Sequence, residues 1–323
     1  KMNIYIIHSD IIHIKLYSMN INLKLVTSSA AVIMVIGLAL NATAQAGSEI
    51  IDTLESKTID AAESQVEEVG RSRLGYIFDK AELDVEFSNG KPEFELGALK
   101  AYDGNNANSF LFNQIGINGY DDRTTLNLGL GYRILNTDNT WMGGTNIFYD
   151  HEFPNDHKRS SIGIELISSA MQLRANKYNG MTGFITDRSG TDSQALDGND
   201  ASLKIALPYF PGAYFEYSKY KWDAVEGAID AEGNKYSLGG NLSDNLSFSF
   251  IRTDYDDASK SDINRAQFKY SWYFGSESKE PTLFEMADKA YQLRNLTTQK
   301  YDLVKRENRI VKQKKFGATA SGF

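Results

Sequence analysis

The sequence predicts an all-β fold, a transmembrane β-barrel of twelve antiparallel strands. Three observations predict it: an N-terminal export signal, repeated runs in which apolar and polar side chains alternate, and connections whose lengths alternate between short and long. Such barrels cross the bacterial outer membrane with alternating strands rather than with apolar helices, so that membrane is the expected location. The expected parts of the chain are upstream residues plus signal peptide (1–46), a periplasmic helical segment (47–80), the barrel (81–274) and a C-terminal helix with an extended linker (275–323).

The N-terminal part has the composition of a secretory signal peptide. Translation is expected to start at Met19, with Lys24 supplying positive charge and residues 30–40 forming an apolar core. Residues 44–46 read Ala-Gln-Ala, which is the small-residue spacing of a cleavage site, so we expect cleavage after Ala46. The alternative is a membrane-spanning helix, but spanning takes about 20 apolar residues and this core is shorter.

The segment between the cleavage site and the barrel has a helical pattern. Apolar side chains such as Ile51, Leu54 and Ile59 recur among acidic ones at helical spacing. We therefore expect residues 47–80 to be a helical segment in the periplasm.

From residue 81 onward the period changes to two, which is the period of a β-strand. In 123–133, for example, four apolar side chains from Leu126 to Tyr132 share one face, while Asn127 to Arg133 supply the other. The twelve expected strands cover 81–88, 92–101, 108–118, 123–133, 140–150, 158–166, 170–178, 201–208, 213–222, 234–242, 245–254 and 264–274.

Alternation alone fits a soluble β-sandwich as well as a barrel, because a sandwich also has one apolar face. The lengths of the connections favour the barrel. Even-numbered connections are short, as at 167–169 and 243–244, whereas most odd-numbered ones are long, as at 179–200 and 223–233. Membrane barrels have short periplasmic turns and longer outer loops, so both barrel ends, near Ala81 and Phe274, are expected in the periplasm.

Aromatic residues near the strand ends indicate interfacial girdles, which are typical of membrane barrels. The expected girdle residues are Tyr132, Trp141, Phe148, Tyr149, Tyr178, Tyr209, Phe210, Trp222, Tyr255, Trp272 and Phe274.

Five stretches resemble the β-domain of the inverse autotransporters, the intimin–invasin family. They are "FLFNQIGINGYDDRTTLNLGLGYR" (110–133), "WMGGTNIFYDHEF" (141–153), "HKRSSIGIEL" (157–166), "ASLKIALPYFPGAYFEYSKYKWD" (201–223) and "KYDLVKRENRIVKQ" (300–313). The resemblance implies a twelve-stranded outer-membrane barrel with a periplasmic N-terminus. It also implies a helix and linker that pass through the pore and carry a C-terminal passenger outward.

In that family the passengers are typically Ig-like adhesin domains, whereas only residues 315–323 follow the leader here. The expectation is therefore a barrel with a vestigial or missing passenger, and no receptor can be named.

The last expected strand ends in four aromatic residues spaced two apart: Phe268, Tyr270, Trp272 and Phe274. On a strand all four point the same way, toward lipid. The resemblance implies that such a terminal aromatic strand is the signal recognised by the barrel-assembly machinery.

Residues 280–296 are expected to form a helix, with Pro281 in its first turn. At about 1.5 Å per residue this helix would be ~24 Å long, close to the ~25 Å apolar band of such barrels. It is expected to plug the pore, and the alternative is a surface helix in the periplasm. Its apolar stripe, the set of pore-helix candidates, is Leu283, Met286, Ala287, Ala290 and Leu293.

Composition excludes several other classes of function. The formal net charge of −8 lacks the basic face of a nucleic-acid binder, and the absence of cysteine removes thiol chemistry and Cys-ligated metals. His151 and His157 flank an acidic loop but show no metal-ligand pattern. Residues 187–200 lack the spacing of a calcium loop and are expected to be a solvated outer loop. No nucleophile–base pair is present, so we expect no catalytic residue, metal or cofactor, and no enzyme.

The function that fits best is an export and anchoring barrel that translocates or anchors a C-terminal segment at the cell surface. Two alternatives stay open: a passive porin-like channel, and a stand-alone surface adhesin that acts through outer loops, chiefly 179–200. Outer-membrane lipid and the assembly machinery are the expected partners.

Overall fold

The computed structural model describes residues 3–7, 11–16, 19–21, 77–88, 93–102, 108–120, 123–187, 190–257, 260–274 and 280–315. Three short strands, β1 (Asn3–Ile7), β2 (Ile11–Leu16) and β3 (Met19–Ile21), form one sheet near the N-terminus. The expected cleavage site and most of the helical segment expected at 47–80 lie outside the described residues, and Lys80, the last residue of that segment, begins strand β4 instead. The chain divides into two compact units, 1–77 and 78–323, and the second contains the barrel.

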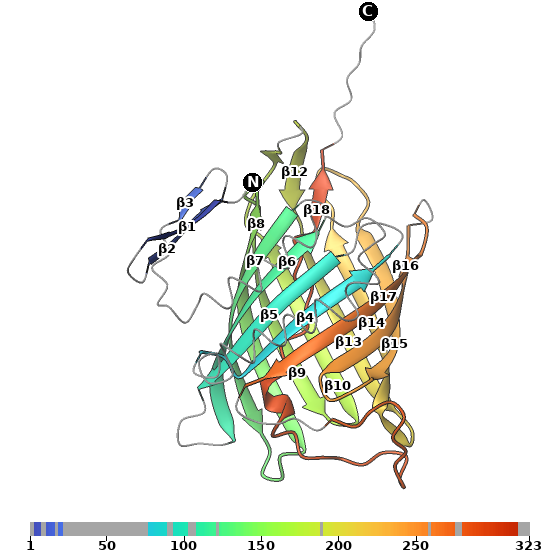
Figure 1. Ribbon diagram of the computed structural model, residues 1–323. Coiled ribbons are helices and arrows are strands. Elements are labelled where there is room, and N and C mark those ends of the chain that lie inside the picture. Colours follow the sequence, from blue (N-terminus) through green and yellow to red (C-terminus); the bar gives the residue numbers. More distant parts are fainter. Residues whose placement is uncertain are drawn as a thin grey trace, which may run out of the picture. The chain divides into compact units, whose positions relative to one another are not determined.

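Twelve antiparallel strands close into one barrel, which confirms the predicted fold class (Figure 1). Consecutive strands pair around the wall, and the last strand closes the barrel by pairing with the first, with Phe268 opposite Val85. The strands are β4 (Lys80–Phe87), β5 (Glu93–Tyr102), β6 (Ser109–Tyr120), β7 (Arg123–Leu135), β8 (Trp141–Phe153), β9 (Lys158–Ser168), β10 (Met171–Gly180), β13 (Asp197–Leu207), β14 (Phe210–Asp223), β15 (Ala231–Asn241), β16 (Leu246–Tyr255) and β17 (Ile263–Tyr273).

The two ends of the barrel differ in their connections. Short turns at 136–140, 169–170, 208–209 and 242–245 gather at one end, which we call the short-turn end. The longer connections, including 181–196, 224–230 and 256–262, gather at the other, the long-loop end.

The longest connection is not the solvated loop that the sequence suggested. It contains β11 (Ile185–Thr186) and β12 (Asp192–Ala195), and β12 also pairs with β18 (Lys312–Lys314) from the C-terminal part of the chain. The prediction was wrong because the partner strand lies more than a hundred residues away, where local composition gives no sign of it.

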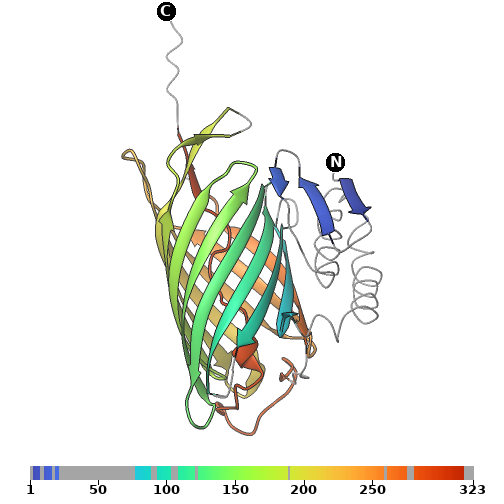
Figure 2. The same cartoon turned by 90° about the vertical axis from the view of Figure 1, so that its left-hand side faces the viewer.

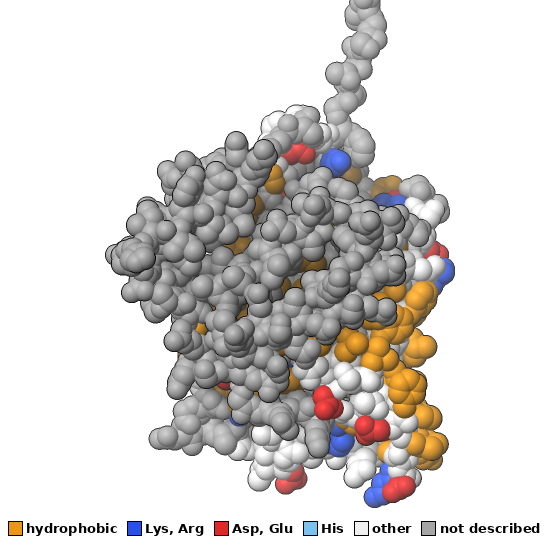
Figure 3. All heavy atoms as spheres, viewed as in Figure 1, with side chains coloured by type: hydrophobic (Ala, Val, Ile, Leu, Met, Phe, Trp, Pro, Cys, Tyr) orange, Lys and Arg blue, Asp and Glu red, His pale blue; other side chains and the backbone are white. Residues whose placement is uncertain are grey.

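Outward and inward side chains alternate along the wall. On β7 the outward Leu128 and Leu130 are 45% and 60% exposed, whereas the inward Asn127 and Arg133 are buried. Figure 3 shows hydrophobic side chains gathered on the outer surface of the barrel where the described atoms are visible. An apolar exterior around a polar interior is the arrangement of a membrane barrel.

Three of the aromatic residues expected in girdles line the interior instead. Phe148, Tyr178 and Trp222 are at most 4% exposed and lie on the inward face of their strands. Phe148 and Tyr149 are neighbours on one strand, so they must point to opposite faces, and Tyr149 is the exposed one. Nearness to a strand end was a poor guide because it ignores this parity.

The interior has an apolar core near the short-turn end. Its buried residues are Leu99, Ala101, Phe110, Phe112, Leu135, Met142, Phe148, Ile167, Leu296, Leu303 and Val304. Gly131 on β7 lies so close to the Phe112 ring that a Cβ would overlap it. A glycine is therefore required there by the close approach of the ring.

The helix expected at 280–296 is absent, and we call this stretch the rim segment. It follows the short-turn end and bonds to one turn after another: Leu283 N–H to Asn241 O (2.8 Å), Ala287 N–H to Tyr209 O (2.8 Å) and Leu296 N–H to Asn139 O (2.7 Å). Backbone groups that bond to other turns cannot also form the i to i−4 bonds of a helix. The prediction rested on an apolar stripe, and these turns override it.

Among the residues described, no helix is long and apolar enough to span a membrane. A single 3-10 turn, η3 (Gln299–Tyr301), follows the rim segment where the chain enters the barrel.

Candidate functional site: the lumen and the segment it holds

The C-terminal part of the chain runs through the inside of the barrel. Residues 299–311, which we call the lumen segment, enter at the short-turn end beside the turn at Asn139. They leave at the long-loop end, where Leu196 donates its N–H to the carbonyl of Val311 at 3.0 Å. Figure 2 shows this segment inside the ring of strands, with β18 beyond it.

Inward side chains on β6 to β10 bond to the main chain of the lumen segment. Arg133 donates to the carbonyls of Lys300 and Asp302 at 2.8 and 2.6 Å. Asn118 and Asn127 both donate to the carbonyl of Asn308, at 3.1 and 2.9 Å.

The same wall makes further main-chain bonds on either side of these. Asn176 donates to Lys305 O (3.3 Å), and Arg159 donates to Glu307 O (2.6 Å) and Arg309 O (2.8 Å). Gln114 and Tyr178 accept main-chain N–H groups through their side-chain oxygens, from Val304 and Glu307 at 2.8 and 2.7 Å. Polar main-chain groups that would otherwise be buried without partners are thus satisfied.

Every charged side chain from residue 302 to residue 312 pairs with an opposite charge on the barrel wall. The six pairs are Asp302–Lys80 (2.6 Å), Lys305–Glu216 (2.8 Å), Arg306–Asp150 (2.6 Å), Glu307–Lys235 (3.3 Å), Arg309–Glu93 (2.5 Å) and Lys312–Glu152 (2.6 Å). The barrel partners come from five strands, β4, β5, β8, β14 and β15. The charges of this segment therefore match the barrel around most of its circumference.

The Arg306–Asp150 pair lies at the centre of this arrangement. Both side chains are fully buried, and Arg159 approaches the same carboxylate at 2.8 Å. The Arg306 guanidinium lies 4.5 Å from the centre of the Phe148 ring. The carboxylate lies between two guanidiniums, one of them over an aromatic face, so each of these solvent-inaccessible charges has a partner.

At the long-loop end His157 holds the small sheet of β11, β12 and β18 against the barrel. Its side chain is fully buried, with Nε2 3.0 Å from Ser193 Oγ and Nδ1 3.3 Å from Thr182 Oγ1. Burial and the nearby Lys312 ammonium lower the pKa of His157. His151 instead pairs with Asp156 at 2.6 Å, so the two histidines do not converge.

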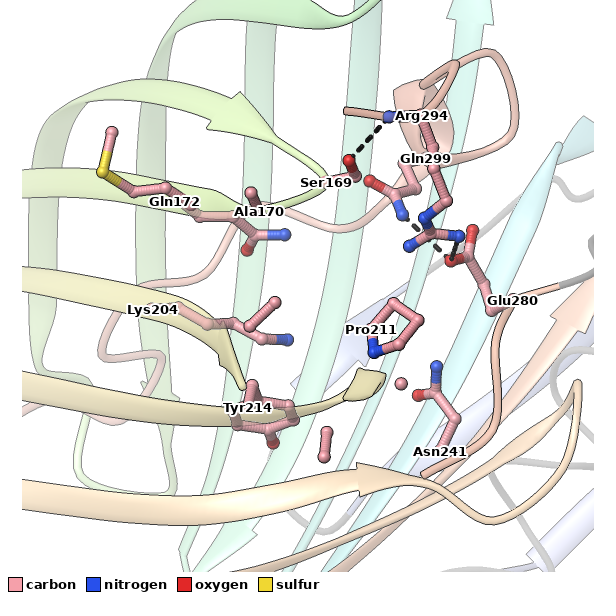
Figure 4. Close-up of a pocket in the computed structure, with 14 residues that line it drawn as sticks. Ser169, Ala170, Gln172, Lys204, Pro211, Tyr214, Asn241, Glu280, Arg294 and Gln299 are labelled. Atoms are coloured by element: carbon pink, nitrogen blue, oxygen red, sulfur yellow. Dashed lines mark hydrogen bonds and ion pairs between the residues drawn. The ribbon is translucent and has the colours of Figure 1, made fainter. Parts of the chain in front are cut away.

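A small cavity of about 60 Å³ lies between the barrel wall and the rim segment at the short-turn end (Figure 4). Lys204 and Tyr214 face it from the wall, and the Arg294–Glu280 pair closes the opposite side at 3.4 Å. Ligand pockets are usually ~300 Å³ or larger, so this cavity is a gap beside the rim segment rather than a binding pocket.

The sequence model described as "Inverse autotransporter, beta-domain" matches residues 35–308, which include the whole barrel and most of the lumen segment. The chain belongs to this family. An inverse autotransporter β-domain is a barrel of the bacterial outer membrane, which is therefore where this one resides.

Relatives of this inverse autotransporter β-domain include proteins named invasin, inverse autotransporter adhesin and intimin. Invasin from Yersinia enterocolitica is 30% identical over 185 residues, which cover 55% of this chain and 21% of invasin. The "Inverse autotransporter adhesin YeeJ" of Escherichia coli K12 is 28% identical over 250 residues, covering 74% of this chain and 10% of the relative. Intimin from Citrobacter freundii is 26% identical over 290 residues, covering 84% and 30%. The chain thus spans between 10% and 30% of the length of these relatives.

A solved structure from a study of the in-meso crystallization of membrane proteins has the same fold. It matches with a TM-score of 0.63 and 21% identity, over 74% of this chain and 100% of that chain.

The pore-helix candidates of this β-domain do not lie in the pore. Leu283, Met286, Ala287, Ala290 and Leu293 belong to the rim segment, where Met286 and Leu293 are exposed. The lumen is occupied instead by residues 299–311, which belong to the linker that the family resemblance expected to follow the helix through the pore.

The aromatic residues of the closing strand keep the expected parity along β17. Phe268 is exposed, and Tyr270 and Trp272 lie on the same face at intermediate exposure. Phe274 lies just past the strand, buried, with its N–H bonded to Asp79 O at 2.9 Å. Their role in assembly stays a prediction.

The sequence alone did not identify the side chains that bind the lumen segment. The sequence does indicate that some of these side chains face the lumen, because Asn118, Asn127 and Arg133 fall on the polar positions of strands that alternate regularly. The dense alternating charges of 302–312 were a second signal.

Proposed function

We propose that this β-domain is an export and anchoring unit, which carries the chain beyond its lumen segment to the cell surface and holds it there. The observation that supports this most is the path of the lumen segment. It enters at the short-turn end, crosses the barrel, and pairs through β18 with β12 beyond the rim. A chain that passes through the lumen in this way connects the two ends of the barrel.

The orientation follows from the general architecture of outer-membrane barrels, whose short turns face the periplasm and whose longer loops face outward. The rim segment and the start of β4 are then periplasmic, while β18 is on the outer side. Residues after Lys315 would emerge at the surface. Because one relative is named an adhesin, we propose that such residues present an adhesive part.

For assembly, we propose that the aromatic end of β17, with Phe268, Tyr270, Trp272 and Phe274, is read by the barrel-assembly machinery. The outward aromatic face of this strand and its position as the closing strand support this role. Lipid is the partner of the outer wall.

A passive channel has less support, because the lumen segment bonds to the wall along its length. A stand-alone adhesin acting through 179–200 also has less support, because β12 in that stretch pairs with β18. No catalytic role is proposed.

An epitope fused after Phe323 tests the proposal in intact cells. We expect antibody binding and protease sensitivity of the epitope without permeabilisation, in a barrel that shows heat-modifiable mobility. A periplasmic reporter that stays protected controls for membrane integrity. An epitope that is reached only after permeabilisation would refute export.

A further inference from the structure

Besides apolar packing, two kinds of polar contact hold residues 300–312 in the barrel. Main-chain contacts are made by Gln114, Asn118, Asn127, Arg133, Arg159, Asn176 and Tyr178, which we call the main-chain track. Side-chain contacts are made by Asp302, Lys305, Arg306, Glu307, Arg309 and Lys312, which we call the six-charge key. A main-chain carbonyl is the same in every residue, whereas a charge is not.

We propose that the lumen binds extended polypeptide in two ways: the main-chain track accepts any exported stretch, and the six-charge key stops the chain in one register. This inference rests on the proposed export function and assigns that function its substrate class, an extended chain of unspecified sequence. It also assigns the signal that ends movement.

The position of the track suits a sliding chain. Its seven residues all lie on β6 to β10, so they form one wall that follows the segment from Lys300 to Arg309. An extended chain repeats its carbonyl positions every two residues, about 6.6 Å. A chain that advances therefore presents new carbonyls to the same donors.

The key, by contrast, fits only one register. If the segment stopped one residue short of its observed position, each wall residue would face the next residue toward the C-terminus. Asp150 would then face Glu307, a like charge. Of the six wall residues, only Glu216 would meet an opposite charge, that of Arg306. If the segment advanced one residue too far, each wall residue would face the preceding residue of the segment. Lys235 would then face Arg306, a like charge. Only Asp150 would meet an opposite charge, that of Lys305.

Shifts by two residues fail as well. Two residues short, Glu216 would face Glu307 and Lys235 would face Arg309. Two residues too far, Lys235 would face Lys305 and Glu93 would face Glu307. Each wrong register thus brings like charges together on the barrel wall.

Burial makes these mismatches costly. Asp150 and Arg306 are both fully buried, and a buried charge without its partner is strongly destabilising. Main-chain bonds can re-form after a shift, but the key cannot, so movement ends where all six charges are matched.

The register can be measured on the purified protein because the chain contains no cysteine. A pair of substitutions, Glu216→Cys with Lys305→Cys, reports the observed register through a short bis-thiol crosslinker. A second pair, Glu216→Cys with Leu303→Cys, reports a chain advanced by two residues. Two glycines are then inserted after Thr297, at the entrance to the lumen.

If the key sets the register, the inserted glycines loop out at the rim and residue 305 still crosslinks. With Arg306→Gln and Arg309→Gln added, the crosslink is expected to spread to residue 303. Transfer to residue 303 by the insertion alone would overturn the key, because the register would then be set by distance from the rim.

Export kinetics test the track. Asn118→Ala with Asn176→Ala removes two main-chain donors and is expected to slow appearance of the surface epitope by about fivefold or more, with the crosslink at residue 305 unchanged. Gln267→Ala is the matched control, since Gln267 faces inward on β17 but bonds to Ser249. Unchanged kinetics in the double variant would overturn the track. Crosslinking needs no export, so failure of the epitope to appear in the parent would refute the proposed function while the key is still measured.

Discussion

Arg306 of the lumen segment and Asp150 of β8 are joined by an ion pair of 2.6 Å in which neither side chain is exposed to solvent. Arg159 shares the same carboxylate and also donates to the carbonyl of Glu307. The Asp150 carboxylate thus links Arg306 of the lumen segment to Arg159, which binds the main chain of that segment. The stability of the barrel and the position of the segment are therefore expected to change together.

Asp150→Asn is expected to destabilise the protein by about 3–5 kcal/mol, because it leaves two buried guanidiniums with one neutral partner. Unfolding in urea, followed by loss of heat-modifiable mobility, measures the change. Arg252→Gln is the control, since Arg252 forms ion pairs whose side chains are 37–45% exposed and should matter by less than ~1 kcal/mol. Equal effects of the two substitutions would contradict the central role of the buried pair.

Gly131→Ala is expected to cost about 1–3 kcal/mol, because the added methyl group overlaps the Phe112 ring and the core must shift. Combining it with Phe112→Leu should recover part of that loss. Gly143→Ala serves as the matched control on the neighbouring strand, where a Cβ meets nothing within 4 Å. The same urea titration compares them, and an equal loss for both glycines would show that the ring contact is unimportant.

The strands could be predicted because each carries its own signal. In β7, for instance, the apolar residues from Leu126 to Ile134 alternate with polar residues or glycine. The apolar side chains face lipid and the other positions face the polar interior, so both environments favour this pattern. The rim segment could not be predicted, because its conformation is set by turns such as those of Asn139 and Tyr209, far away in the sequence. Its apolar stripe was real but did not reveal which groups would satisfy its backbone.

Lowering the pH is expected to loosen the small sheet at the long-loop end. The pKa of His157 lies below its ordinary value of 6.5, first through burial and then through Lys312. The folded state thus favours the neutral ring, so its contribution to stability is present above pH 6.5 and is lost as the pH falls from there through the lowered pKa. Hydrogen exchange of the β12–β18 amides at pH 7.5 and pH 5, corrected for intrinsic rates, measures this loss.

In the His157→Gln variant the exchange protection of β12 and β18 should no longer depend on pH over this range. Persistence of the same pH dependence in that variant would mean that His157 is not the group responsible.

Ser169→Ala is expected to release part of the rim segment. The Ser169 hydroxyl accepts the N–H of Arg294 at 2.8 Å and donates to the carbonyl of Gln292 at 3.2 Å. Trypsin cleavage after Arg294 should therefore become faster. Ser243→Ala is the control, because that hydroxyl bonds within its own turn, to Leu246 N–H. Faster cleavage in both variants would mean that turn stability, rather than the bond to the rim segment, protects this site.

The candidate site was only partly readable from the sequence. The charges of residues 302–312 are visible in the sequence, but their partners Lys80, Asp150 and Lys235 are spread over strands whose mutual positions depend on barrel closure. Phe148 and Tyr178 were assigned to the wrong face because their place near strand ends was weighed above the parity of their neighbours. Assigning each strand residue to the inner or outer face by its alternation with its neighbours would have identified most of the residues that line the lumen.

Single cysteines on either side of the lumen segment report which side of the membrane each end of the segment occupies. Lys315→Cys lies just beyond β18 and Thr297→Cys just before η3, and both parent side chains are accessible to solvent. Intact cells are treated with a membrane-impermeant maleimide before and after permeabilisation. If the segment crosses the barrel outward, residue 315 is labelled in intact cells and residue 297 only after permeabilisation. Labelling of residue 297 alone in intact cells, or protection of residue 315, would contradict a chain that crosses the barrel outward.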